Sequence, residues 1–246
     1  MLTIEHLTKH YKGSDKGITD LSLHIRPGDI FAFIGHNGAG KTTTLKCVAG
    51  IQDFDAGTIR VGGRDILEDS IECKRMLAYI PDNPDIYEYL TGIQYLNFIA
   101  DIFQVSADLR KERIGKYGDA FEITSSLGDL VSTYSHGMKQ KLAIISALVH
   151  GPSLLILDEP FVGLDPKASV ILKDIMHRFC GDGGAIFFST HVLDVAERLC
   201  NRVAIIKDGR LVTSGDMEKV LAEGESLESI FMEVTGQRDC ISQEIL

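Results

Sequence analysis

The stretch GHNGAGKTT, residues 35–43, matches the pattern GxxxxGK[ST] of a phosphate-binding loop. Its glycines let the backbone wrap so that successive N–H groups point at one anion, and the following helix adds its positive N-terminus. Lys41 can reach the β- and γ-phosphates of a nucleotide, and the Thr42 hydroxyl can ligate Mg²⁺. The predicted nucleotide-binding residues are Gly35, Asn37, Gly38, Ala39, Gly40, Lys41, Thr42 and Thr43.

A pair of carboxylates closes the apolar run SLLILDEP, residues 153–160. A carboxylate at the end of a buried strand is expected to bind a cation or hydrogen-bond donors, because an isolated buried charge is costly. Asp158 is therefore predicted to support Mg²⁺ together with Thr42. Glu159 is a candidate general base for an attacking water, the alternative being a solvated carboxylate at the strand end.

The stretch YSHGMKQKL, residues 134–142, sets a serine beside a histidine and a glycine. A serine hydrolase would need Ser135 activated by a histidine with a third orienting group, whereas adjacent side chains point different ways and no GxSxG motif is present. Zinc binding by His136 lacks a second ligand at metal spacing. Ser135, the Gly137 backbone and the N-terminus of the following helix can instead bind an anion.

The elements that position these residues are indicated by three continuous apolar runs, 30–34, 153–160 and 185–190. Continuous runs are typical of strands buried on both faces of a parallel sheet. Helical sequence follows each run, at 41–51, 166–179 and 192–200, and this alternation predicts an α/β fold. Hairpin sequences at 2–11 with 18–29, at 57–66 and at 202–215, the last with an Asp208–Gly209 turn, predict an antiparallel β subdomain.

The domain organisation is predicted to be a single domain over residues 1–246. Residues 1–82 and 135–215 form the catalytic core with its β subdomain, and 83–134 form an inserted helical subdomain. Within that insertion, 87–103 and 106–121 have helical character. Residues 216–246 are expected to form short C-terminal helices and a polar tail.

Composition narrows the function classes. A formal net charge of −10 argues against a nucleic-acid partner, which requires clustered Lys and Arg. No apolar run approaches the ~18 residues that cross a bilayer, so we expect no direct membrane insertion. Five cysteines without a CxxC pair favour free thiols in a reducing, cytoplasmic setting.

These motifs, in this order, resemble the nucleotide-binding subunits of ATP-binding cassette (ABC) transporters over nearly the whole chain. Tyr11 precedes the first loop, where the family stacks an aromatic ring on adenine, although exposed tyrosines are common. GLD, residues 163–165, falls at the family's D-loop, and STH puts His191 at the switch histidine that contacts the γ-phosphate. YSHGM, residues 134–138, occupies the position of the signature usually written LSGGQ.

The resemblance implies a P-loop NTPase (RecA-like) fold and ATP hydrolysis with Mg²⁺, with Glu159, His191 and Lys41 as catalytic residues. In the family, two subunits pair head to tail and the signature of one covers the γ-phosphate held by the other. Ser135, Gly137 and Asp165 would then complete the nucleotide site of a second ATPase subunit, most simply in a homodimer.

The same resemblance implies separate transmembrane permease subunits and a peripheral location on the cytoplasmic face of the cell membrane. SHGMKQK at 135–141 and SLESIFMEVTG at 226–236 look like the ATPases of bacterial ABC-2-type exporters, which favours export. The helical stretch 83–100, with Tyr87 and Tyr89, is the expected docking face, unless these tyrosines pack within the helical subdomain.

Three positions depart from the family pattern. Asp82 stands where the family has a Gln that touches Mg²⁺, and it either binds the metal through water or is a loop carboxylate. His136 replaces the first glycine of the signature and Met138 its glutamine, so the His136 side chain is expected to point away from phosphate.

Two other classes of protein also contain a phosphate-binding loop of this kind. A soluble regulatory ATPase built on the same cassette would need a long coiled coil or a second cassette, and the sequence has neither. A P-loop kinase or GTPase would lack the signature, and a GTPase would usually carry an Asn-Lys-x-Asp motif. The ABC transporter ATPase is therefore the favoured reading.

Overall fold

The computed structural model describes residues 1–13, 16–221 and 226–235. The predicted polar tail after residue 236, with Cys240, lies outside the described residues. The two short helices expected near the C-terminus are α8 (Met217–Val220) and α9 (Leu227–Thr235). None of the helices in the described part combines the length and the apolar character needed to cross a bilayer.

The central sheet has six strands in the order β10-β9-β3-β8-β7-β6. The three predicted buried strands are β3 (Ile30–Ile34), β7 (Leu154–Asp158) and β8 (Ala185–Thr190), and every residue in them is buried. They pair in parallel with one another and with their neighbours β6 (Leu77–Ile80) and β9 (Arg202–Lys207). The prediction of an α/β fold with a parallel sheet is thus confirmed.

Strand β6 and the helix before it, α2 (Ser70–Met76), were not predicted. The strand has only four residues, LAYI, which is too short for an apolar run to stand out in the sequence. It is fixed instead by its pairing with β7, a tertiary contact between distant segments.

A second, antiparallel sheet has the order β2-β1-β4-β5. Its strands are β1 (Leu2–His10), β2 (Gly17–Ile25), β4 (Ala56–Val61) and β5 (Arg64–Asp65), as the hairpin patterns predicted. The remaining predicted hairpin joins β9 to β10 (Arg210–Asp216) at the edge of the parallel sheet. Asp208 and Gly209 both have positive φ, 47° and 74°, which a tight hairpin turn of the primed type requires.

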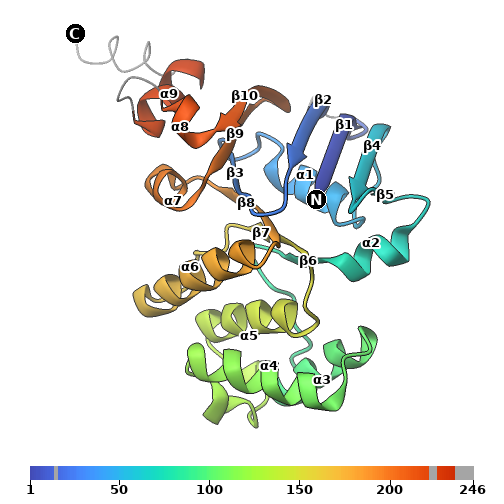
Figure 1. Cartoon of the computed structure of the whole chain (residues 1–246), viewed down its shortest axis with the longest axis vertical. Helices are drawn as coiled ribbons and strands as arrows, with labels where there is room; N and C mark the ends of the chain where they lie inside the picture. The colour runs from blue at the N-terminus through green and yellow to red at the C-terminus, as the bar shows by residue number, and fades with distance from the viewer. Residues whose placement is uncertain (14–15, 222–225, 236–246) are drawn as a thin grey trace.

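The parallel sheet separates two hydrophobic cores. Alternate residues of β3 divide between them, with Ile30 and Ile34 in one core and Phe31 and Phe33 in the other. One core includes residues of α5 (His136–Val149), α6 (Pro166–Gly181), α7 (Leu193–Leu199) and α9. The other includes α1 (Lys41–Val48) and the four-stranded sheet. The result is a layered molecule (Figure 1). The parallel sheet lies between the layer of α5, α6 and α7 and the layer formed by α1 and the four-stranded sheet.

The insertion between β6 and α5 is helical. It contains α3 (Gly92–Ile102), α4 (Ala107–Ala120) and two 3-10 turns, Thr124–Ser126 and Val131–Thr133. Figure 1 shows α3 and α4 at the bottom of the molecule, with α5 between them and the sheet. The first helix begins later than the sequence pattern suggested, because Thr91 and Gln94 form a capping box at its start.

Candidate functional site

The loop between β3 and α1 is shaped by two glycines. Gly40, the residue before the helix, has φ 107°, in the left-handed region that only glycine adopts freely. At Gly35 a Cβ atom would lie 2.6 Å from the carbonyl oxygen of Ile206 in β9, so no larger residue fits. The sequence motif therefore reflects backbone conformation at one position and strand packing at the other.

Lys41 opens α1 and is buried, with 7% of its surface exposed. Its Nζ donates hydrogen bonds to the carbonyl oxygens of Gly35, at 2.6 Å, and His36, at 3.3 Å. Burial lowers the pKa of the ammonium group, and the negative charges of Glu159 and Asp158 oppose that shift. The positive charge is thus held against the loop and close to both carboxylates.

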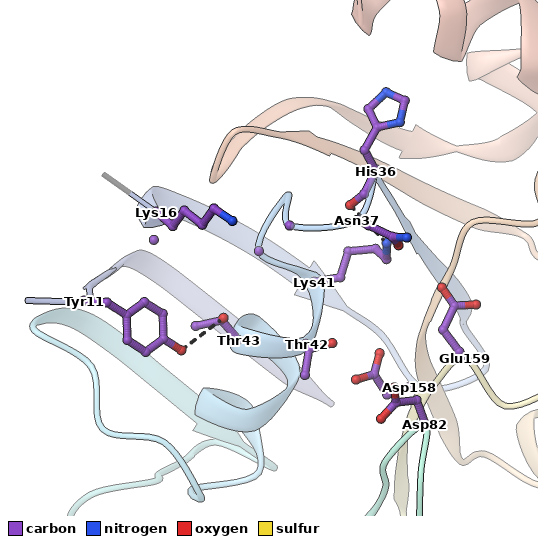
Figure 2. A pocket seen from close by; sticks show the side chains of 13 residues that line it. Tyr11, Lys16, His36, Asn37, Lys41, Thr42, Thr43, Asp82, Asp158 and Glu159 are labelled. Carbon is purple, nitrogen blue, oxygen red and sulfur yellow. Dashed lines mark hydrogen bonds between the residues drawn. The ribbon is translucent and has the colours of Figure 1, made fainter. Parts of the chain in front are cut away.

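A cavity of about 330 Å³ opens over this loop (Figure 2). Figure 2 shows Tyr11 at one end, the carboxylates of Asp82, Asp158 and Glu159 at the other, and Lys41 and Thr42 between them. The predicted site residues that line the cavity are Tyr11, Asn37, Gly38, Gly40, Lys41, Thr42, Thr43, Asp82, Asp158 and Glu159.

Three further residues line the same cavity and were not singled out from the sequence: Lys16, Gly17 and His36. His36 occupies a variable position of the loop motif, and the other two lie at the start of β2, far from any motif. His36 could have been identified from its place inside the loop motif, whereas no sequence signal identifies Lys16 and Gly17, because only the packing of β2 beside the loop brings them here.

Tyr11 follows β1 and is 41% exposed. Its hydroxyl is hydrogen-bonded to the Thr43 hydroxyl at 3.2 Å, and the Lys9 ammonium group lies 5.8 Å from the ring centroid. The ring is therefore fixed beside α1 with a face available for stacking on a planar group.

Both acidic residues at the end of β7 are hydrogen-bonded to Ser189 of β8, Asp158 through its carboxylate and Glu159 through its backbone N–H. Asp158 is 1% exposed, and its Oδ1 accepts a hydrogen bond from the Ser189 hydroxyl. Among the described residues its Oδ2 has no hydrogen-bond partner. Glu159 has φ 48°, which is unusual for a residue with a side chain, and its N–H donates to both oxygens of Ser189 at 3.2 Å.

His191 follows β8 and contacts Glu159. Its Nδ1–H donates to Glu159 Oε1 at 2.8 Å, with the histidine side chain 58% exposed and the glutamate side chain 15% exposed. A histidine that orients a carboxylate at the edge of a phosphate-binding cavity suits activation of a water molecule.

The residues fit a magnesium ion of the kind that binds nucleotides. In the part of the chain described, no three His, Cys, Asp or Glu side chains are arranged to hold a metal by themselves. Mg²⁺ typically takes one or two protein ligands and completes its shell with phosphates and water. The Oδ2 of Asp158, which has no hydrogen-bond partner within residues 1–13, 16–221 and 226–235, meets that need, and Thr42 and Asp82 line the same cavity. The Asp82 Oδ1 also accepts the N–H of Asn83 at 2.9 Å.

The signature residues lie elsewhere. Ser135 caps α5 by accepting the N–H of Met138 at 3.3 Å, and neither Ser135 nor Gly137 lines the cavity over the phosphate loop. The His136 ring is turned toward the D-loop, since a Cβ atom on Gly163 would lie 2.4 Å from its Cδ2. The structure thus does not bring the signature to the phosphate loop of the same chain.

Asp165 is also away from the cavity. It caps α6 by accepting the N–H of Ala168 at 2.8 Å and forms an ion pair with Lys141 of α5 at 2.8 Å. The bond with Lys141, more than the cap, keeps the pKa of Asp165 below its usual range. The D-loop and the signature helix are therefore connected within one chain.

Comparison with known proteins identifies the family. The sequence model described as "ABC transporter" matches residues 18–162. The ABC-type transporter ATP-binding protein EcsA of Bacillus subtilis (strain 168) is 31% identical over 239 residues, which cover 96% of this chain and 96% of EcsA.

Solved structures agree with the sequence comparison. A chain described as the ATP binding subunit of an ABC transporter superposes with a TM-score of 0.91 and 32% identity, covering 96% of this chain and 99% of that one. The ATP-binding cassette MJ0796, solved as a dimer in a post-hydrolysis state with ADP and Pi, has the same fold, with a TM-score of 0.79. It is 22% identical, and the match covers 89% of this chain and 99% of MJ0796.

Proposed function

The chain belongs to the ABC transporter family as an ATP-binding protein, and we propose that it drives a transporter whose membrane-spanning subunits are separate chains. As a member of this family it is an ATPase. The observation that carries the proposal is that the phosphate loop, Asp158 and Glu159 line one cavity, with His191 hydrogen-bonded to Glu159. ATP bound there has its reactive end among the residues that can hydrolyse it.

Binding of the triphosphate is assigned to the loop. Lys41 neutralises phosphate charge, and the N–H groups of the glycine-rich turn and the start of α1 donate to the phosphate oxygens. Thr42 and Asp158 would hold Mg²⁺, and Asp82, which lines the same cavity, would contribute to its binding. Mg²⁺, when bound, neutralises charge on the β- and γ-phosphates. Tyr11 stacks on the adenine ring.

Hydrolysis is assigned to Glu159 and His191. Glu159 accepts the proton of the attacking water as a general base, which the half-buried position of its side chain and its bond to His191 support. His191 orients Glu159 through Nδ1–H, and in the form with both ring nitrogens protonated it also donates through Nε2–H to the γ-phosphate as charge develops there. Lys41 takes up part of the same charge.

Dimerisation completes the site. Ser135 and Gly137 begin α5, which is long enough for its N-terminus to attract an anion, yet they are absent from their own chain's cavity. A second copy in head-to-tail orientation supplies these residues to the γ-phosphate. The Lys141–Asp165 ion pair supports this arrangement, because it lets the signature and the D-loop approach the partner as one unit.

The domain division follows the assignment of these roles. Residues 1–82 and 135–215 provide the catalytic core with its β subdomain, and 83–134 provide the helical subdomain. The helices α3 and α4 within that insertion support this division. Residues 216–246 form the C-terminal extension, of which α8 and α9 are described.

The membrane partner docks on the helical subdomain. Tyr87 and Tyr89 are 47% and 74% exposed, with ring centroids 5.7 Å apart, and Phe98 extends the aromatic surface. Beside them a groove of about 320 Å³ is lined by Ile51, Tyr95, Phe103 and other residues where β6, α3 and α5 meet. The subunit is thereby peripheral on the cytoplasmic face of the membrane. The exporter-like signature and C-terminal sequence favour export.

Co-purification with detergent-solubilised membrane proteins tests this proposal. A permease-type chain should be recovered with the ATPase, and ATP turnover should rise in the complex. Tyr89→Ala should reduce recovery, whereas Val170→Ala, which alters an exposed apolar residue on α6, should not. An ATPase that is recovered only as soluble homodimers, with no stimulation by membrane fractions, would favour the soluble regulatory class instead.

A further inference from the structure

We propose that Ser189 is a positioning residue for ATP hydrolysis, whose single buried hydroxyl orients both Asp158 and Glu159. The inference rests on the proposed roles of these two carboxylates at Mg²⁺ and at the attacking water. It concerns a residue of β8 to which the STH motif assigns no role.

The contact depends on two neighbouring strands. β7 and β8 run in parallel, and Asp158 is in register with Ser189. Ser189 is completely buried, so water cannot replace its hydrogen bonds. Its hydroxyl hydrogen goes to Asp158 Oδ1, and its oxygen accepts the N–H of Glu159 at 3.2 Å. Only a group that both donates and accepts can hold the two residues at once.

The bond to Asp158 sets the orientation of a buried carboxylate. With Oδ1 engaged by Ser189, the other oxygen is the one left without a partner among the described residues. Figure 2 shows this carboxylate on the same side of the cavity as Thr42. Ser189 thus leaves one defined oxygen of Asp158 for a cation and prevents the carboxylate from rotating. Residues that are hydrogen-bonded to a metal ligand affect metal binding in this way, by fixing the orientation of the ligand.

The bond to Glu159 stabilises an unusual backbone. A φ of 48° at Glu159 is a conformation that residues with a Cβ adopt only when the surroundings enforce it. The N–H of Glu159 donates to both the hydroxyl and the carbonyl oxygen of Ser189. The Glu159 carboxylate accepts a hydrogen bond from His191, which lies two residues after Ser189 in the chain. One strand end therefore fixes Glu159 from its backbone and from its side chain.

The test uses variants that remove the hydroxyl with and without a change of volume. Ser189→Ala deletes it. Ser189→Thr and Ser189→Val have nearly the same volume and differ only in keeping or losing it. Ser153→Ala is the matched control, since Ser153 donates to Met76 O at 3.1 Å at the opposite end of the sheet. Thermal unfolding of each variant confirms that it folds.

Two readouts separate positioning from a merely structural role. The first readout is turnover: in Ser189→Ala and Ser189→Val, kcat should fall roughly tenfold to a hundredfold. The second is binding of a fluorescent ATP analogue in a Mg²⁺ titration. The Mg²⁺ concentration at half-saturation should rise by about tenfold in the same two variants. Binding of the analogue without Mg²⁺ should be unchanged. Ser189→Thr and Ser153→Ala should stay within about threefold of the wild type in both measurements. Both variants keep a hydroxyl at position 189 that can bond to Asp158 and Glu159.

A wild-type Mg²⁺ dependence and kcat in Ser189→Ala would overturn the inference, and so would equal losses in Ser189→Thr and Ser189→Val, which would indicate volume rather than the hydroxyl. Neither result would contradict the proposed function, ATP hydrolysis with Glu159 as the general base, provided that Glu159→Gln remains inactive in the same assays. Undiminished turnover in Glu159→Gln would instead remove the proposed general base, whatever Ser189→Ala does.

Discussion

The imidazole of His191 lies 2.8 Å, Nδ1 to Oε1, from the carboxylate of Glu159, although the two residues are 32 positions apart in the chain. The contact arises because β7 and β8 are neighbours and each delivers its last residues to the same edge of the sheet. The proposed base is thus oriented within one chain. We expect pairing with a second chain to complete phosphate binding rather than to assemble the base.

Glu159→Gln tests the general base. The amide keeps the size of the side chain but cannot take a proton from water, so turnover should fall by about 10² to 10⁴ while ATP binding is retained. Phosphate release measures turnover, and light scattering with ATP should detect a more persistent dimer. Glu218→Gln, at an exposed position of α8, is the control. Hydrolysis near the wild-type rate in Glu159→Gln would exclude Glu159 as the base.

His191→Ala separates orientation from binding. Loss of the hydrogen bond to Glu159 and of the proposed donor to the γ-phosphate should lower kcat by roughly 10², with a much smaller effect on the KM for ATP. Steady-state kinetics at saturating Mg²⁺ measure both constants. A rise in KM with unchanged kcat would mean that His191 contributes to nucleotide binding only.

Lys41→Ala tests the phosphate site. A charged hydrogen-bond donor contributes roughly 1.5–3 kcal/mol, so the dissociation constant for ATP should rise about tenfold to a hundredfold or more. Lys46→Ala, near the other end of the same helix, should bind ATP as the wild type does. Because Lys41 also donates to the carbonyl oxygens of Gly35 and His36, thermal unfolding of the nucleotide-free variant must accompany the titration. Equal affinity in both variants would contradict the assignment of Lys41.

The pH dependence of stability tests whether His150, whose ring nitrogens are buried, stays neutral in the folded protein. His150 stacks on Phe103 with ring centroids 3.8 Å apart, and burial, helped by the charge of Arg113, lowers its pKa from 6.5 to about 4. Below about pH 6.5 the unfolded chain therefore takes up a proton that the folded protein does not bind until about pH 4. The protein should lose up to about 3 kcal/mol of unfolding free energy across this window as the pH falls, because each pKa unit corresponds to about 1.4 kcal/mol.

Chemical denaturation of the wild type and His150→Gln across the same window measures this contribution. The glutamine cannot be protonated, so the loss on acidification should be smaller in the variant. His177→Gln, at an exposed position of α6, is the matched control. Identical pH dependence in the wild type and His150→Gln would show that burial does not keep His150 neutral.

Much of the architecture was predictable because the signals are local. Continuous apolar runs identified β3, β7 and β8, and turn residues identified the β9–β10 hairpin. Strand β6 was not predicted, because a run of four residues is too short to show a periodicity that distinguishes a strand from a loop or a helix end. The start of α3 was misjudged because its capping box, rather than apolar spacing, sets the boundary.

The candidate site divides in the same way. The sequence alone determined which residues could form a phosphate loop and a carboxylate pair, because their spacing follows directly from backbone geometry at a strand-to-helix turn. Tertiary structure decided which of them meet. It joined Ser189 to Asp158 across two strands, turned His136 toward Gly163, and kept the signature out of its own chain's cavity. Such contacts depend on which strands lie side by side and on which side chains fill the space between them. Neither property can be predicted from the spacing of residues along a short stretch of sequence.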